Sequence, residues 1–174
     1  GLEFAYGIPG SIGGAVFMNA GAYGGQMEDV VVDVEYVNRD GEIQVLQKQQ
    51  LDFGYRHSAF SERIGIICGV RMKLKEGDKD EIRAKMQELA KRRRESQPLD
   101  LPSAGSVFKR PEGGYAAQLI DEAGFKGFTV GGAQVSPKHA GFIVNIGGAK
   151  ASDVLKIIDY VQRKVEERTG IELE

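Results

Sequence analysis

The sequence has one cysteine, Cys68, and this scarcity excludes two classes of site. One thiol cannot form a disulfide within the chain, and it cannot build a metal centre held by several thiolates. Cys68 lies in the apolar run of residues 66–70, which predicts a buried strand, and no basic residue adjoins it to activate the thiol. We therefore interpret Cys68 as an inert core residue.

Long apolar runs and an excess of one charge are also missing. No stretch approaches the roughly 20 consecutive apolar residues that a membrane-spanning helix needs. The 23 basic and 25 acidic residues give a net charge of −2, which argues against a protein that coats nucleic-acid phosphates. The chain begins at Gly1 with neither an initiator methionine nor a signal peptide, so we expect an internal part of a longer, cytoplasmic protein.

Glycine, in contrast, is abundant and clustered. The 174 residues include 24 glycines, about twice the usual share, with eight in residues 1–25 and ten in residues 105–148. Such clusters let the main chain turn tightly or approach a ligand closely. Apolar residues make up 41% of the chain and charged residues 28%, which is typical of a folded globular protein.

The spacing of apolar residues predicts an α+β chain with a domain boundary near residue 76. Residues 1–75 are predicted to be mostly β, and the part after a loop over residues 97–102 is predicted to follow the order αββα. In the first part we expect a short helix near residues 13–19, a hairpin over 29–47 and a strand over 64–75. Helices over 80–95, capped by Asp78 or Asp80, and over 114–123 should follow, and then strands near 128–130 and 141–146. The last helix should run from its N-cap Ser152 to Thr169, and its apolar face should consist of Leu155, Ile158, Val161 and Val165.

The first glycine cluster is a candidate nucleotide site. Its glycines could bring main-chain N–H groups against a pyrophosphate, or they could serve only as tight turns. It has neither the preceding strand of a dinucleotide fingerprint nor the Gly-Lys-Ser/Thr of a P-loop. The cluster reads Gly7, Ile8, Pro9, Gly10, Ser11, Ile12, Gly13 and Gly14, followed by Asn19, Ala20, Gly21 and Ala22.

Two further segments carry candidate catalytic residues. Arg56, next to Tyr55 in a loop, has the planar fork that holds a carboxylate in two hydrogen bonds, although it could also be an ordinary surface arginine. Ser106 could be a nucleophile or a proton donor, aided by the charge of Lys109. A hydrolase triad has poor support, because the sequence lacks Gly-x-Ser-x-Gly and offers only two histidines as bases.

A fourth segment, residues 131–141, contains Gln134 and His139 and reads on its own as a turn between strands. Two distant histidines without paired carboxylates predict no metal site. The basic run of residues 91–94 closes a predicted helix, where cations are favoured anyway, so we interpret it as a solvated face rather than a nucleic-acid patch.

Taken in order, the four segments resemble those of the UDP-N-acetylenolpyruvoylglucosamine reductase family. Those enzymes use FAD and NADPH to reduce the enolpyruvyl group of UDP-N-acetylglucosamine enolpyruvate, giving UDP-N-acetylmuramate for peptidoglycan. The resemblance implies the later part of a two-lobed FAD-binding domain in residues 1–75, then an α+β substrate-binding domain in residues 76–174. It also implies a fragment, without the family's N-terminal FAD lobe and without its last catalytic glutamate beyond Glu174.

The same resemblance implies roles for individual residues. Arg56 would hold the substrate carboxylate and stabilise the developing enolate, and Ser106 would donate the proton that quenches it. Arg110 departs from the asparagine that is usual after Phe108-Lys109. FAD would lie against Gly7, Ile8, Pro9, Gly10, Ser11, Gly13, Gly14, Asn19, Ala20, Gly21 and Ala22, and the UDP-sugar against Tyr55, Lys109, Gln134 and His139.

Other functions remain open on the sequence alone. One is a non-catalytic module that binds a UDP-sugar on the same scaffold. Another is a related flavin oxidase, disfavoured because the segments around Ser106 and Gln134 belong to the substrate domain of the reductases. No nucleic-acid or membrane partner is expected.

Overall fold

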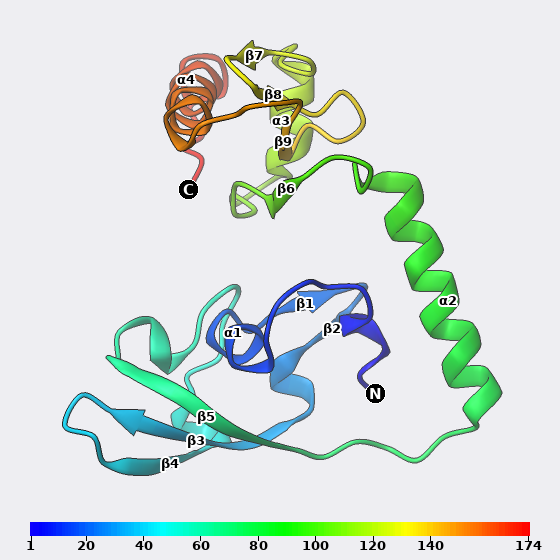
Figure 1. Ribbon diagram of the computed structural model, residues 1–174, viewed down its shortest axis with the longest axis vertical. Helices are drawn as coiled ribbons and strands as arrows, with labels where there is room; N and C mark the ends of the chain where they lie inside the picture. The colour runs from blue at the N-terminus through cyan, green and yellow to red at the C-terminus, as the bar shows by residue number, and fades with distance from the viewer. The chain divides into compact units, whose positions relative to one another are not determined.

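The computed structural model describes all 174 residues, and the chain divides into two compact units, Gly1–Arg92 and Arg93–Glu174 (Figure 1). Each unit combines helices with antiparallel strands around its own hydrophobic core, which confirms the α+β class. The division falls inside one helix, α2 (Lys79–Ser96). The assignment of residues 1–75 and 76–174 to two functional domains stays a prediction.

A three-stranded antiparallel sheet organises the first unit. Its central strand, β3 (Val31–Asn38), lies between β4 (Ile43–Gln47) and β5 (Gly65–Met72), as the predicted hairpin and third strand require. The side chain of Asn38 closes the β3–β4 turn, because its Oδ1 accepts hydrogen bonds from the main-chain N–H of Asp40 (3.0 Å) and Glu42 (2.9 Å).

The prediction that Cys68 is buried is wrong, since its thiol is exposed. Glu35 pairs with Gly69 and Tyr36 pairs with Ile67, so the pairing of β3 with β5 skips Cys68. This bulge breaks the alternation of β5, and β5 is also an edge strand of its sheet. A continuous apolar run therefore indicated a strand correctly without indicating which of its side chains the core covers.

Short elements precede the sheet and link its strands. Helix α1 (Ile12–Phe17) confirms the predicted short helix, but the hairpin of β1 (Gly21–Ala22) and β2 (Gly25–Gln26) was not predicted. Two-residue strands show no alternation that a sequence pattern could reveal. Four 3₁₀ turns complete the unit: Glu3–Ala5, Met27–Asp29, Lys48–Gln50 and Ala59–Ser61.

Helix α2 begins where the sequence predicted it. The carboxylate of Asp78 accepts hydrogen bonds from the main-chain N–H groups of Asp80 (2.9 Å) and Glu81 (3.0 Å), so Asp78 is the capping residue. No helix of the structure is long and apolar enough to cross a membrane.

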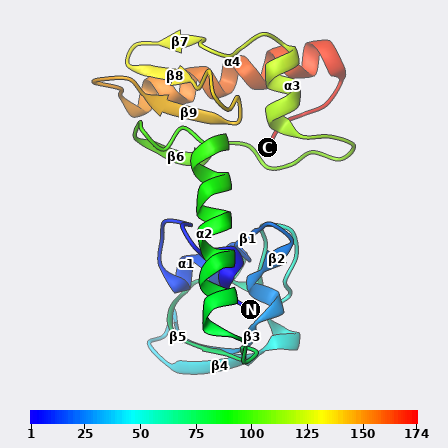
Figure 2. The same ribbon diagram turned by 90° about the vertical axis from the view of Figure 1, so that its right-hand side faces the viewer.

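The second unit is a four-stranded antiparallel sheet with two helices, α3 (Ala116–Glu122) and α4 (Ala151–Thr169), and α4 packs against β7 and β8 (Figure 2). The element order is βαβββα rather than the expected αββα, because the two strands β6 and β8 were read as loops. Both are short, and β6 consists only of small residues. The strands run in the order β6 (Ser103–Ser106), β9 (Phe142–Asn145), β8 (Ala133–Val135) and β7 (Thr129–Val130).

Helix α4 ends at Thr169 as predicted but differs in its cap and its buried face. Lys150, not Ser152, is the N-cap, and its main-chain N–H is held by the carboxylate of Asp153 at 3.0 Å. Leu155 is 63% exposed, because it lies outside the buried stripe of the helix. The residues fully in the core are Ile157, Val161 and Val165.

Candidate functional site

The glycine loop of the first unit presents exposed main chain in front of α1. Gly7 (φ +81°) and Gly10 (φ +142°) adopt backbone conformations that other residues avoid. A Cβ added to Gly10 would meet no atom within 4 Å, so neighbouring side chains do not explain the glycine there. The hydroxyl of Ser11 accepts the N–H of Gly14 at 3.1 Å and caps the helix. This open stretch fits a ligand that contacts main chain closely.

The second half of the cluster is packed more tightly. A Cβ on Gly21 would come within 2.9 Å of both the Gln26 Cβ and the Gly25 carbonyl oxygen, so the β1–β2 hairpin itself requires glycine there. The side chain of Asn19 is fully buried, with 0% exposure. Because this exposure is that of the whole residue, a ligand could contact the neighbouring Ala20, Gly21 and Ala22 but not Asn19 itself.

Arg56 is fixed against this hairpin. Its Nη2 donates to the carbonyl oxygen of Gly21 at 3.0 Å, and its guanidinium lies 5.1 Å from the ring centre of Tyr55. Its other nitrogens have no hydrogen-bond partner within the first unit and can bind an anion. The structure therefore brings together Arg56 and Gly21, which lie 35 residues apart. The sequence carried no signal for that contact.

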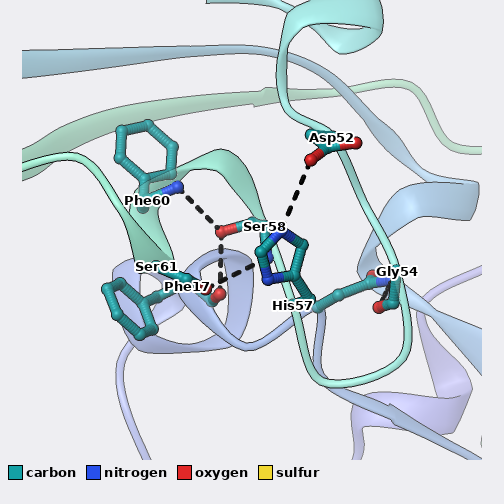
Figure 3. Close-up of polar contacts among 8 residues, drawn as sticks. Phe17, Asp52, Gly54, His57, Ser58, Phe60 and Ser61 are labelled. Carbon is teal, nitrogen blue, oxygen red and sulfur yellow. Dashed lines mark hydrogen bonds and ion pairs between the residues drawn. The ribbon is translucent and has the colours of Figure 1, made fainter.

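Tyr55 and His57 flank Arg56 with different surroundings. Tyr55 is 55% exposed, so a ligand at Arg56 could also reach its ring. His57 Nε2 lies 3.4 Å from the carboxylate of Asp52, on the same loop (Figure 3). His57 therefore contacts a carboxylate, but no serine hydroxyl completes a triad in this unit.

Ser106 lies at the end of β6, in the second unit. The pairing of β6 with β9 is irregular between Ser103 and Ser106, and Gly105 between them has φ +95°. The side chain of Ser106 is exposed, and its hydroxyl makes no hydrogen bond within the chain. Such a hydroxyl is free to meet a ligand. Arg56 belongs to the first unit and Ser106 to the second.

Two of the predicted substrate residues already have partners in the second unit. Lys109 Nζ lies 3.0 Å from the carboxylate of Glu174, and its main-chain N–H donates to the carbonyl oxygen of Glu174 at 2.7 Å. Gln134 Nε2 donates to Thr129 Oγ1 at 3.0 Å and to the Gly127 carbonyl oxygen at 3.3 Å. A ligand that uses either side chain has to compete with these contacts.

His139 is held as a neutral ring. Burial is the main cause that lowers the pKa of His139 below its usual value of 6.5, and the nearby charge of Lys126 acts in the same direction. Nδ1 accepts the N–H of Gly141 at 3.1 Å, so the proton of the neutral ring lies on Nε2. His139 can therefore donate from Nε2. It shares no hydrogen bond with Ser106, and no group of three potential metal-ligating side chains exists.

Comparison with known proteins relates both units to one group of enzymes. A family model described as the C-terminal domain of UDP-N-acetylenolpyruvoylglucosamine reductase matches residues 97–174, which include Ser106. A model described as an FAD binding domain matches residues 1–47, which include the glycine loop.

Individual relatives agree with these matches. A UDP-N-acetylenolpyruvoylglucosamine reductase from Pediococcus pentosaceus is 56% identical over all 174 residues, which cover 58% of that protein. The enzyme of the same name from Thermotoga maritima is 57% identical, with 61% of it covered. The crystal structure of the Thermus caldophilus reductase matches with a TM-score of 0.85 and 45% identity, over 99% of this chain and 62% of that one. The chain thus spans about three fifths of the length of these relatives and is similar, over its whole length, to UDP-N-acetylenolpyruvoylglucosamine reductases.

Proposed function

We propose that this chain is part of a flavin reductase that uses NADPH to reduce the enolpyruvyl group of UDP-N-acetylglucosamine enolpyruvate. The product would be UDP-N-acetylmuramate for peptidoglycan synthesis. One observation carries the proposal: the glycine loop falls in a segment matched to an FAD binding domain, and Ser106 falls in a segment matched to the C-terminal domain of this enzyme type.

The exposed glycine loop is the part of the first unit that fits FAD. The main chain of Gly7 to Gly14 would face the nucleotide, and Gly10 offers unfilled space where any other residue would carry a side chain. In the segment from Asn19 to Ala22, the contacts would come from Ala20, Gly21 and Ala22, because Asn19 is completely buried. When bound, FAD supplies the electrons that it receives from NADPH.

Arg56 would bind the substrate carboxylate and stabilise the negative charge that develops on the enolpyruvyl group. One edge of its guanidinium is held by Gly21, so its remaining donors are oriented before the substrate arrives. Preorganised donors stabilise developing charge more effectively than mobile ones, since no reorientation is needed during the reaction.

Ser106 would donate a proton to the carbon next to the one that is reduced. Its hydroxyl is exposed and engaged by no other group, which is the state required of a donor awaiting its acceptor. A serine hydroxyl is a weak acid, so this role needs a strongly basic intermediate and a site from which water is excluded.

The remaining substrate contacts would come from side chains in both units. Tyr55 offers an exposed ring next to Arg56, and His139 a neutral N–H donor at Nε2. Lys109 and Gln134 would exchange their present partners, Glu174 and Thr129, for polar groups of the UDP-sugar. We propose a cytoplasmic location, where both NADPH and a UDP-sugar are available, and no nucleic-acid or membrane partner.

A purely UDP-sugar-binding module is the less favoured alternative, because the match to an FAD binding domain would then be unexplained. Calorimetry separates the two functions. Tight binding of UDP-N-acetylglucosamine by a protein that takes up no flavin would favour the module.

Substitution of Ser106 tests the catalytic assignment in the full-length protein. Ser106→Ala should leave flavin reduction by NADPH intact and slow reoxidation by the enolpyruvyl substrate at least 100-fold, since general acids typically contribute about 10²–10⁴-fold. Stopped-flow absorbance of the flavin measures both half-reactions.

Ser103→Ala is the matched control, because Ser103 is an exposed serine on the same strand whose hydroxyl only accepts the N–H of Gly105 at 3.4 Å. It should alter neither half-reaction. If Ser106→Ala slowed both half-reactions equally, Ser106 would not be the proton donor.

A further inference from the structure

Two polar side chains, Asn19 and Ser58, are completely buried in the first unit, each with 0% exposure. The proposed chemistry uses neither side chain. A buried polar group costs free energy unless its hydrogen bonds are made, so its partners indicate what it holds in place.

Asn19 uses both ends of its amide. Its Nδ2 donates to the carbonyl oxygen of Gly54 at 2.9 Å, and its Oδ1 accepts the main-chain N–H of Glu28 at 3.0 Å. One side chain therefore links the segment after α1 to the loop that carries Arg56, 35 residues further along the chain.

Ser58 anchors the other end of the same loop, as Figure 3 shows. Its hydroxyl donates to the carbonyl oxygen of Phe17 at 2.7 Å and accepts the N–H of Phe60 at 3.3 Å. Phe17 is the last residue of α1. Both anchors thus tie the Arg56 loop to the C-terminal end of α1 and the residues just after it.

Between the anchors, the loop holds an unfavourable conformation. Gly54 and His57 exchange two main-chain hydrogen bonds, of 3.1 and 3.3 Å, and Arg56 inside this tight turn has φ +52°. A left-handed arginine persists only where the surroundings enforce it. The guanidinium then reaches back to Gly21, two residues after Asn19. Backbone and side chain of Arg56 are therefore both positioned from the 19–21 segment.

We infer that Asn19 is a positioning residue: its amide fixes the Gly54 carbonyl, and through that turn it sets the place and direction of the Arg56 guanidinium. The inference rests on the proposed function, which makes Arg56 the group that binds the substrate carboxylate. It replaces the expectation that FAD lies against Asn19, because a residue with 0% exposure does not face a ligand.

Asn19→Asp in the full-length protein is the sharpest test. The change keeps the size of the side chain, its acceptor for the Glu28 N–H and the tolerance of a left-handed backbone, which Asn19 needs at φ +42°. The change alters the Nδ2 donor, which serves the Gly54 carbonyl at 2.9 Å and, less closely, Gln26 Oε1 at 3.4 Å. A protonated carboxyl can still donate to the Gly54 carbonyl, whereas an ionised one repels it.

The variant should therefore gain a pH dependence of reoxidation in addition to any that the parent protein has. Burial raises the pKa of a carboxyl group above its free value of about 3.9, so the introduced group should titrate in an accessible range. Above that pKa, reoxidation of the flavin by the enolpyruvyl substrate should be at least tenfold slower than in the parent, and at acidic pH it should recover. Flavin reduction by NADPH and flavin affinity should not change.

Asn38→Asp is the matched control, because Asn38 also accepts main-chain N–H groups in a turn of the first unit but does not contact the Arg56 loop. It should add no pH dependence to reoxidation. Should Asn19→Asp prevent folding, Ser58→Ala removes the other anchor, and Asn38→Asp remains the control, because the Ser61 hydroxyl on the same 3₁₀ turn accepts the Ser58 N–H at 3.4 Å. Ser58→Ala should then slow reoxidation, while Asn38→Asp should not.

Reoxidation of Asn19→Asp at the parent rate at every pH would overturn the inference, as would a loss of flavin affinity that accounts for the whole effect. A parent protein that the enolpyruvyl substrate fails to reoxidise contradicts the proposed function instead. In that case, amide hydrogen exchange of His57 still tests whether Asn19 positions the loop, because this measurement needs no substrate. Protection of this N–H should fall in Asn19→Asp as the pH rises, and unchanged protection would reject the positioning role.

Discussion

At the scale of single residues, the site combines groups identified by type with contacts that no local pattern reveals. Arg56 and Ser106 stood out because a fork of donors and a hydroxyl suit a carboxylate and a proton transfer. The partner of Arg56, the Gly21 carbonyl, lies 35 residues away and is a main-chain atom. Sequence can suggest which side chains carry chemistry, whereas their orientation depends on tertiary contacts.

His139 gives a prediction for pH dependence at this scale. Its pKa is lowered in the folded state, mainly by burial, so the unfolded chain takes up a proton before the folded chain does. Protonation also removes the Nδ1 acceptor for the Gly141 N–H. Stability of the second unit should therefore decrease as the pH falls below about 6.5, the usual pKa of the group.

Thermal unfolding of the 174-residue chain between pH 7.5 and 5 measures this effect. His139→Asn, which keeps an acceptor near the Gly141 N–H, should weaken the loss on acidification. His57→Asn, the same change at the other histidine, should leave it in place. An acid-induced loss of equal size in both variants and the parent chain would contradict the role of His139.

At the scale of elements, predictability followed length. Helices α2 and α4 and the strands β3 and β5 were expected close to their observed ranges, because eight or more residues display a period clearly. The strands β1, β2, β6 and β8 have two to four residues and were missed, although the equally short β7 and β9 were expected near 128–130 and 141–146. Cys68 and Leu155 were expected in the core, but the bulge of β5 leaves the thiol exposed, and Leu155 lies outside the buried stripe of α4.

Two glycines in neighbouring elements should respond oppositely to alanine. Gly14 is an exposed residue of α1 where a Cβ would make only an ordinary 3.4 Å contact with Ser11 Oγ, so Gly14→Ala should stabilise the unit by roughly 0.5–1 kcal/mol. Gly21→Ala would clash with main chain of β2 and should destabilise it by about 1–3 kcal/mol. Urea unfolding measures both changes.

The Gly14→Ala variant also tests the cofactor site in the full-length protein. Gly14→Ala should weaken FAD binding, measured by flavin fluorescence, even though it strengthens the fold, because the added methyl occupies the surface proposed to face the nucleotide. An unchanged FAD affinity in Gly14→Ala would remove Gly14 from the cofactor site.

At the scale of the whole molecule, the chain contains two separate hydrophobic cores. Leu51 in the first unit and Ile157 in the second are each fully buried, with 0% exposure. Replacing either by alanine should cost about 2–5 kcal/mol in the unit that contains it. We expect two transitions in calorimetry, with Leu51→Ala lowering one and Ile157→Ala lowering the other. A single transition that both variants lower equally would instead mean that the units unfold together.

The exposure of Cys68 has a practical consequence. Because it is the only thiol, one maleimide dye would attach at one known point, the bulge of β5. Ile67, its neighbour in the chain, lies next to Gly13 of α1, so a change in dye emission on adding FAD would test whether the cofactor is sensed at the bulge. A second cysteine placed in the unit of residues 93–174 would allow a donor–acceptor dye pair to be attached. Energy transfer between the two dyes would then follow the units as cofactor and substrate bind.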